Sequence, residues 1–143
     1  MAPLNLQLVY PMFGLFFLIA LVLSRLFYLR QKAVRSGAVK LNYYKTYSQA
    51  IEPESLVQAS RHFSNLFEAP VLFFVVCILG MIVPVESPFF VVLAWLYVAA
   101  RAIHAWIHMG RNKVLYRMQA YFIGWIVLAI MWLMVLFKTI IAG

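Results

Sequence analysis

Four long apolar segments, separated by short polar ones, follow one another along the chain. They cover about residues 6–29, 61–85, 89–109 and 116–141. Each segment reaches the length of ~20 helical residues that crosses a bilayer. The pattern therefore predicts an all-α integral membrane protein. Its single domain, residues 1–143, would be a bundle of four transmembrane helices.

The composition excludes a water-soluble domain. Of the 143 residues, 66% are hydrophobic and only 11% are charged, which leaves too little polar surface for a soluble protein of this size. The one cysteine, Cys77, lies inside an apolar segment and cannot form a disulfide within the chain. It is interpreted as a small buried hydrophobic residue.

Positive charge is distributed unevenly between the two ends of the predicted helices. Of the twelve Lys and Arg residues, all except Lys138 lie on one side, if Arg61 and Arg101 are counted with that half. Since basic loops remain in the cytoplasm, we expect this side to be cytoplasmic and both termini to face away from it. The net charge of +8 then faces anionic lipid head groups rather than nucleic acid, for which no binding module is visible.

Polar residues recur on one face of the second apolar segment. Arg61, Asn65 and Glu68 are spaced i, i+4, i+7, so on one continuous helix they would lie within an arc of about 60°. An ionisable side chain at membrane depth is costly and normally faces the protein interior or a wet cavity. We therefore expect this face to point inward and a cation to meet Glu68.

The third apolar segment carries a matching stripe of Arg101, His104 and His108. From the rise of a helix, Glu68 lies ~10 Å and Arg101 ~13 Å below the same membrane boundary. Similar depth and opposite charge predict an ion pair between them. Arg117 and Tyr121 open the fourth segment at the same level, so the three helices together predict a cationic pocket in the cytoplasmic half.

Each residue also has a purely structural interpretation. The ion pair could only fix helix register, and His104 could be a hydrogen-bonded core residue. Arg61 and Arg117 could be anchors at the lipid head groups, and Tyr121 a packing residue. The coincidence of stripes on three helices at one level favours a functional site. No metal-ligand motif accompanies the histidines, so we expect no metal.

Three motifs resemble those of the MAPEG family, the membrane-associated proteins in eicosanoid and glutathione metabolism. The motifs are Arg61-x-x-x-Asn65-x-x-Glu68-x-Pro70, Arg101-x-x-His104, and the basic turn of residues 110–117 followed by Tyr121. The resemblance covers nearly the whole chain, and the short loops are similar to those of the bacterial, microsomal glutathione transferase-like branch. It implies a homotrimer in the bacterial inner membrane, with glutathione as co-substrate bound between neighbouring subunits.

The resemblance also implies roles for individual residues. The glutathione-binding residues would be Arg30, Arg61, Asn65, Glu68, Arg101 and His104, and the catalytic residues Arg117 and Tyr121. Arg30 would reach the site of the neighbouring subunit, with Arg25 as the second choice. Arg117 would lie beside the thiol. The chain departs from the pattern at His108, where some members have a tyrosine, and at Met118, where some have a serine.

The leading hypothesis is a membrane-bound glutathione-dependent transferase or peroxidase acting on apolar electrophiles or lipid hydroperoxides. Because the thiolate is the nucleophile, a cation such as Arg117 would favour its formation. The alternative is a non-catalytic membrane module of the same fold that binds a lipid or protein partner. A small multidrug exporter ranks last, since its key carboxylate would lie in the first segment, which contains no acid.

Overall fold

The computed structural model describes residues 5–47, 52–83 and 85–142, all of them helical or in connections between helices. After a single 3-10 turn, Leu6–Leu8, the helices are α1 (Val9–Arg35), α2 (Tyr43–Thr46), α3 (Glu54–Asn65), α4 (Ala69–Ile82), α5 (Pro88–Met109) and α6 (Val114–Ala142). Four helical stretches are long and apolar enough to span a membrane: Leu6–Arg35, Glu54–Ile82, Pro88–Met109 and Val114–Ile141. The prediction of an all-α membrane protein with four transmembrane helices is confirmed.

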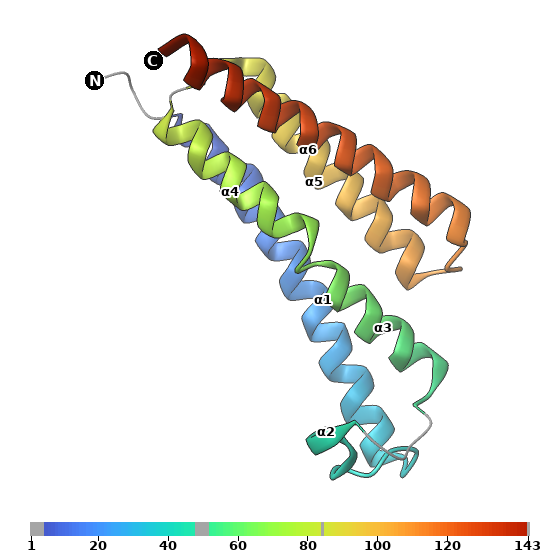
Figure 1. The fold of residues 1–143 in the computed structure, drawn as a ribbon. Coiled ribbons are helices and arrows are strands. Elements are labelled where there is room, and N and C mark those ends of the chain that lie inside the picture. Colours follow the sequence, from blue (N-terminus) through green and yellow to red (C-terminus); the bar gives the residue numbers. More distant parts are fainter. Residues whose placement is uncertain (1–4, 48–51, 84, 143) are drawn as a thin grey trace.

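The helix ends follow from local sequence. Pro88 occupies the first turn of α5, where its missing N–H costs nothing. Gly110 ends α5, and Asn112 then adopts a left-handed backbone conformation with φ of 48°, which asparagine tolerates better than most residues. The connection from α5 to α6 is therefore short, and the two helices lie antiparallel along their length (Figure 1).

The second span is divided into two helices. α3 ends at Asn65, residues 66–68 form a turn, and α4 begins at Ala69. Pro70 explains the break, because it has no N–H for the carbonyl of Leu66 and its ring would collide with that carbonyl. In Figure 1 both pieces lie beside α1, with α4 at the end that holds the termini and α3 at the other.

The main core lies between α1, α4, α5 and α6 and is apolar. At its centre the fully buried rings of Phe73 and Tyr97 stack, with centroids 4.5 Å apart and planes 6° apart. A smaller apolar cluster joins α1 to α3 through Leu26 and Leu56. Large apolar side chains cover the outside of the bundle as well, for example Phe16, which suits a surface that faces lipid.

Membrane topology gives a first prediction. The described ends of the chain lie at one end of the bundle, whereas α2 and the basic C-terminal turn of α1 lie at the other (Figure 1), and Lys40 belongs to the connection between these two helices. Residues 1–4 and 143 lie outside the described residues. Reporters fused after residue 143 and inserted at Lys40 should therefore report opposite sides, with the Lys40 reporter cytoplasmic. A cytoplasmic C-terminal reporter would reverse the orientation we assign to every site below.

Candidate functional site

Small-molecule sites typically have volumes of about 300–1,000 Å³, and a pocket of ≈ 610 Å³ opens where α3 meets the turn between α5 and α6. Arg61 and Asn65 on α3 and Arg117 on α6 line it, as the sequence predicts. The other lining residues are Glu54, Val57, Gln58, Ser60, Ser64, His108, Asn112 and Val114. The pocket thus offers two guanidinium groups, one carboxylate and several uncharged hydrogen-bonding side chains.

Arg117 is held in the pocket by two side chains. Its Nη1 donates a hydrogen bond to Asn112 Oδ1 at 2.7 Å and lies 3.2 Å from His108 Nε2. Asn112 can accept this bond because the left-handed turn after Gly110 places it one turn before Arg117. The α5–α6 turn therefore fixes the position of the cation that the sequence analysis assigns to the thiol.

His104 forms a hydrogen bond with the backbone of Arg117. Its Nδ1 donates a hydrogen bond to the carbonyl oxygen of Arg117 at 3.1 Å, because a carbonyl can only accept. The ring is 4% exposed and is not among the residues that line the pocket. In this chain His104 thus anchors the first turns of α6.

His62 belongs to the same polar cluster and is missed by the sequence analysis. Its ring is fully buried and stacks on that of His108, with centroids 4.6 Å apart and planes 13° apart. His62 follows Arg61 directly, so it lies about 100° around α3 from the stripe of Arg61 and Asn65. The sequence did contain a signal for it. His62 is a polar residue on a second face of α3, and that face packs against His104 and His108 of α5.

Glu68 lies outside the helix that was expected to carry it. It is the residue before α4 in the turn that Pro70 imposes, so the predicted continuous stripe of Arg61, Asn65 and Glu68 is wrong. Its side chain is exposed in the single chain, and its Oε2 accepts a hydrogen bond from the hydroxyl of Tyr121 at 3.4 Å.

Arg101 is buried as predicted but has a different neighbour. The side chain is 2% exposed, and its guanidinium carbon lies 5.0 Å from the ring centre of Tyr97 and 4.8 Å from that of Tyr121. A Cβ at Gly124 would lie only 3.2 Å from Nη2, so the glycine leaves room for the guanidinium.

The predicted ion pair between Glu68 and Arg101 is absent from the described residues. Tyr121 stands between the two charges, offering its hydroxyl to the carboxylate and its ring face to the guanidinium. A cation–π contact stabilises a desolvated cation by about 2 kcal/mol. This contact offsets only part of the cost of burying the Arg101 guanidinium. Equal depth was a correct argument for proximity but not for direct contact.

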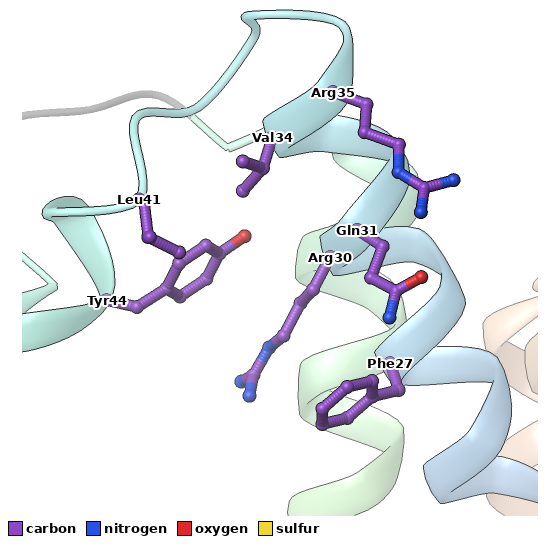
Figure 2. A pocket seen from close by; sticks show the side chains of 7 residues that line it. All are labelled: Phe27, Arg30, Gln31, Val34, Arg35, Leu41 and Tyr44. Carbon is purple, nitrogen blue, oxygen red and sulfur yellow. The ribbon is translucent and has the colours of Figure 1, made fainter.

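Arg30 lies apart from these residues in the single chain. It lines a different pocket, of ≈ 430 Å³, together with Phe27, Gln31 and Arg35 of α1 (Figure 2). Its guanidinium carbon lies 5.4 Å from the ring centre of Tyr44, and its Nη2 donates to the hydroxyl of Tyr47 at 3.5 Å. Within one chain Arg30 therefore does not join Arg117.

The Tyr44 hydroxyl keeps its proton beside Arg30. Burial, followed by the Glu52 carboxylate, raises the pKa of the Tyr44 phenol, while Arg30 acts in the opposite direction. The phenol accordingly remains a hydrogen-bond donor at neutral pH. Figure 2 shows its ring between Leu41 and the α1 face that carries Arg30.

The structure thus sorts the sequence-predicted residues into three groups. Arg61, Asn65 and Arg117 line the pocket of α3 and α6. A second group surrounds Tyr121 and comprises Glu68, Arg101 and His104, none of which lines that pocket. Arg30 forms the third group alone. Within the described ranges, no three His, Cys, Asp or Glu side chains are placed to hold a metal ion.

The fold and this pocket define a four-span membrane protein with a cationic, hydrogen-bonding site among its helix ends. A family model described as the MAPEG family matches residues 8–137. The chain therefore belongs to the MAPEG family. Comparison with curated proteins and with solved structures yields no match.

Proposed function

We propose that this protein is a membrane-bound glutathione-dependent transferase or peroxidase that acts on apolar electrophiles or lipid hydroperoxides. The observation that carries the proposal is the convergence of Arg61, Asn65 and Arg117 on one pocket. Membership of the MAPEG family supports a role in glutathione- or eicosanoid-related chemistry at the membrane. The pocket supplies the groups that such a ligand requires.

Glutathione matches the pocket group by group. It carries two carboxylates, one ammonium, two peptide units and a thiol. Guanidinium groups bind carboxylates through charge-assisted hydrogen bonds, and Arg61 offers one of them, which leaves Arg117 for the thiol. Glu54 offers a partner for the ammonium, and Asn65 can donate and accept at a peptide unit. Glu68, exposed on the turn before α4, is a further partner for the peptide.

The reaction requires a thiolate and an apolar partner in one place. Arg117 would stabilise the thiolate, which then attacks the electrophile and forms a carbon–sulfur bond as the leaving group departs. With a hydroperoxide, the thiolate would attack the terminal oxygen and release an alcohol. A second glutathione would then convert the sulfenic acid into a disulfide and water. In both reactions the protein mainly brings a water-soluble and a membrane-soluble reactant together.

Assembly gives a second prediction, because within one chain Arg30 lines a different pocket from Arg117. We propose a homotrimer in which Arg30 reaches the pocket of the neighbouring subunit. Light scattering in detergent, corrected for bound detergent, should give about three times the chain mass of 16.5 kDa. Full glutathione binding by a monomer would contradict a site shared between subunits.

Glutathione binding tests the function directly. Purified protein in detergent should bind glutathione saturably in calorimetric titration, and Arg61→Gln should weaken binding roughly ten- to a hundredfold, as expected for a lost charge-assisted hydrogen bond. Lys138→Gln is the matched control, because it removes an exposed cation of α6 far from the pocket. It should bind like the unchanged protein.

The alternative function has its own outcome in the same experiment. A pocket that binds anionic lipid from mixed vesicles, but shows no saturable glutathione binding, would identify a non-catalytic membrane module. Equal loss in Arg61→Gln and Lys138→Gln would mean that net charge, rather than the pocket, attracts glutathione.

A further inference from the structure

We propose that His108, in its neutral form, is a positioning residue that holds the Arg117 guanidinium in place, so that acidification displaces this cation and lowers the activity of the site. The inference rests on the proposed function for its catalytic consequence. Its structural part concerns only the contact between two side chains of this chain. The sequence places His108 in the polar stripe of the third apolar segment, but neither His108 nor His62 is assigned a role in binding or catalysis there.

The hydrogen-bonding inventory of the two side chains fixes the protonation state that the contact requires. A guanidinium has only donors and keeps its charge in proteins. The 3.2 Å contact from Arg117 Nη1 to His108 Nε2 can therefore be a hydrogen bond only if Nε2 accepts. The imidazole must then be neutral, with its proton on Nδ1. Protonated His108 would have two donors and would place a second positive charge beside Arg117.

The ring of His108 is held from its face and from its backbone. It stacks on His62, which is fully buried, and the Gln58 side-chain amide donates to the His108 carbonyl oxygen. The ring is itself 2% exposed. The ring therefore has little freedom to turn away from Arg117. A positive charge on the ring would act directly on the guanidinium, because little solvent is in contact with the ring to screen it.

The groups around His108 come from every neighbouring helix. Arg25 of α1 donates to the Met109 carbonyl oxygen at 3.2 Å, and His104 of α5 lies with its ring centre 5.8 Å away. The remaining neighbours are His62 and Glu54 of α3, Arg117 of α6 and Asn112 of the turn. Glu54 lines the same pocket but forms no described ion pair with His108.

Arg117 has a second hydrogen-bond partner, which limits how far protonation of His108 can displace its guanidinium. Asn112 accepts a hydrogen bond from the same Nη1 and does not titrate. Protonation of His108 therefore shifts the guanidinium without freeing it completely. We expect the thiolate at the site to be less stabilised at low pH, in addition to the ordinary protonation of the thiol itself.

Two substitutions of His108 test its two properties separately, the hydrogen-bond acceptor Nε2 and the ring that stacks on His62. His108→Gln keeps an acceptor near Nε2 but loses the ring that stacks on His62, whereas His108→Phe keeps a ring and loses the acceptor. Conjugation of glutathione with a generic electrophile at neutral pH should be roughly tenfold slower in His108→Phe than in His108→Gln. The reverse order would show that stacking alone matters and would overturn the proposal.

The pH profile provides a readout that packing would not change. In the unchanged protein, loss of activity at low pH should involve two protons, one on the thiol and one on His108, so the rate should fall by more than tenfold per pH unit where the thiol is already mostly protonated and His108 titrates as well. In His108→Gln only the thiol titrates, and the fall should approach tenfold per unit. Equal steepness in the two proteins would exclude the switch.

A spectroscopic measurement keeps this inference separate from the proposed function. In protein labelled with ¹⁵N-histidine, His108 at neutral pH should show an unprotonated Nε2 and a protonated Nδ1, and Arg117→Leu should move the Nε2 resonance. This result is expected whether or not glutathione binds. A protonated Nε2 at neutral pH would overturn the positioning role even in an active glutathione transferase.

Discussion

Replacement of Arg117 by alanine should lower the rate of glutathione conjugation at neutral pH by roughly ten- to a hundredfold. The reason is the loss of a cation held 2.7 Å from Asn112 Oδ1 at the pocket wall. Without it, the thiolate of bound glutathione should form at a pH about one to two units higher. Binding should change much less, because Arg61 and Asn65 still line the pocket.

The measurement combines ultraviolet absorbance of bound thiolate against pH with initial rates on the same samples. Part of the lost activity should return as pH is raised, since hydroxide then produces the thiolate that Arg117 no longer favours. Arg117→Lys should be intermediate, because lysine retains the charge but not the planar guanidinium, whose Nη1 contacts both Asn112 and His108.

Controls distinguish this role from a structural one. Lys138→Gln removes a cation of the same helix without touching the pocket and should leave the thiolate titration unchanged. Thermal unfolding should show that Arg117→Ala remains folded. If the thiolate titrates normally in folded Arg117→Ala, Arg117 is only an anchor at the membrane boundary, and Arg61 or the neighbouring subunit's copy of Arg30 becomes the next candidate.

The spans could be predicted from sequence because their lengths and hydropathy suffice. The break in the second span was also visible, since Pro70 prevents a continuous helix through Leu66. Treating residues 61–85 as one helix placed Glu68 on the face of Arg61 and Asn65. The turn of residues 66–68 instead separates it from that face.

Contacts between helices were harder to predict than depths along them. A membrane helix that is apolar on nearly all sides gives little indication of which side faces which neighbour. Glu68 and Arg101 were placed at similar depth, yet Tyr121 lies between their charges. His62 was missed for a different reason, because only the stripe of Arg61 and Asn65 was followed on α3, whereas His62 points in another direction and is buried against α5. Within one chain Arg30 lines a separate pocket, a separation that helical spacing and charge along the sequence do not indicate.

Close packing between α4 and α5 gives the last prediction. A Cβ added at Gly80 would lie 2.6 Å from Cε1 and 3.0 Å from Cζ of Phe90, whose ring is fully buried. Gly80→Ala therefore forces this ring to move within a filled core, which costs ~1–3 kcal/mol. The better helix propensity of alanine offsets only about 1 kcal/mol of that. Thermal unfolding in detergent should show a lower midpoint for Gly80→Ala.

Gly14 provides a matched control on α1, inside another transmembrane helix. A Cβ there would lie 3.4 Å from Trp95 Cζ3 and 3.6 Å from Val98 Cγ1, which is ordinary van der Waals contact. Gly14→Ala should gain helix propensity without a collision, so its midpoint should stay equal or rise, corresponding to at most about 1 kcal/mol. The difference between the two variants isolates the contact with Phe90. Equal midpoints would show that α4 and α5 lie farther apart in the membrane than this packing requires.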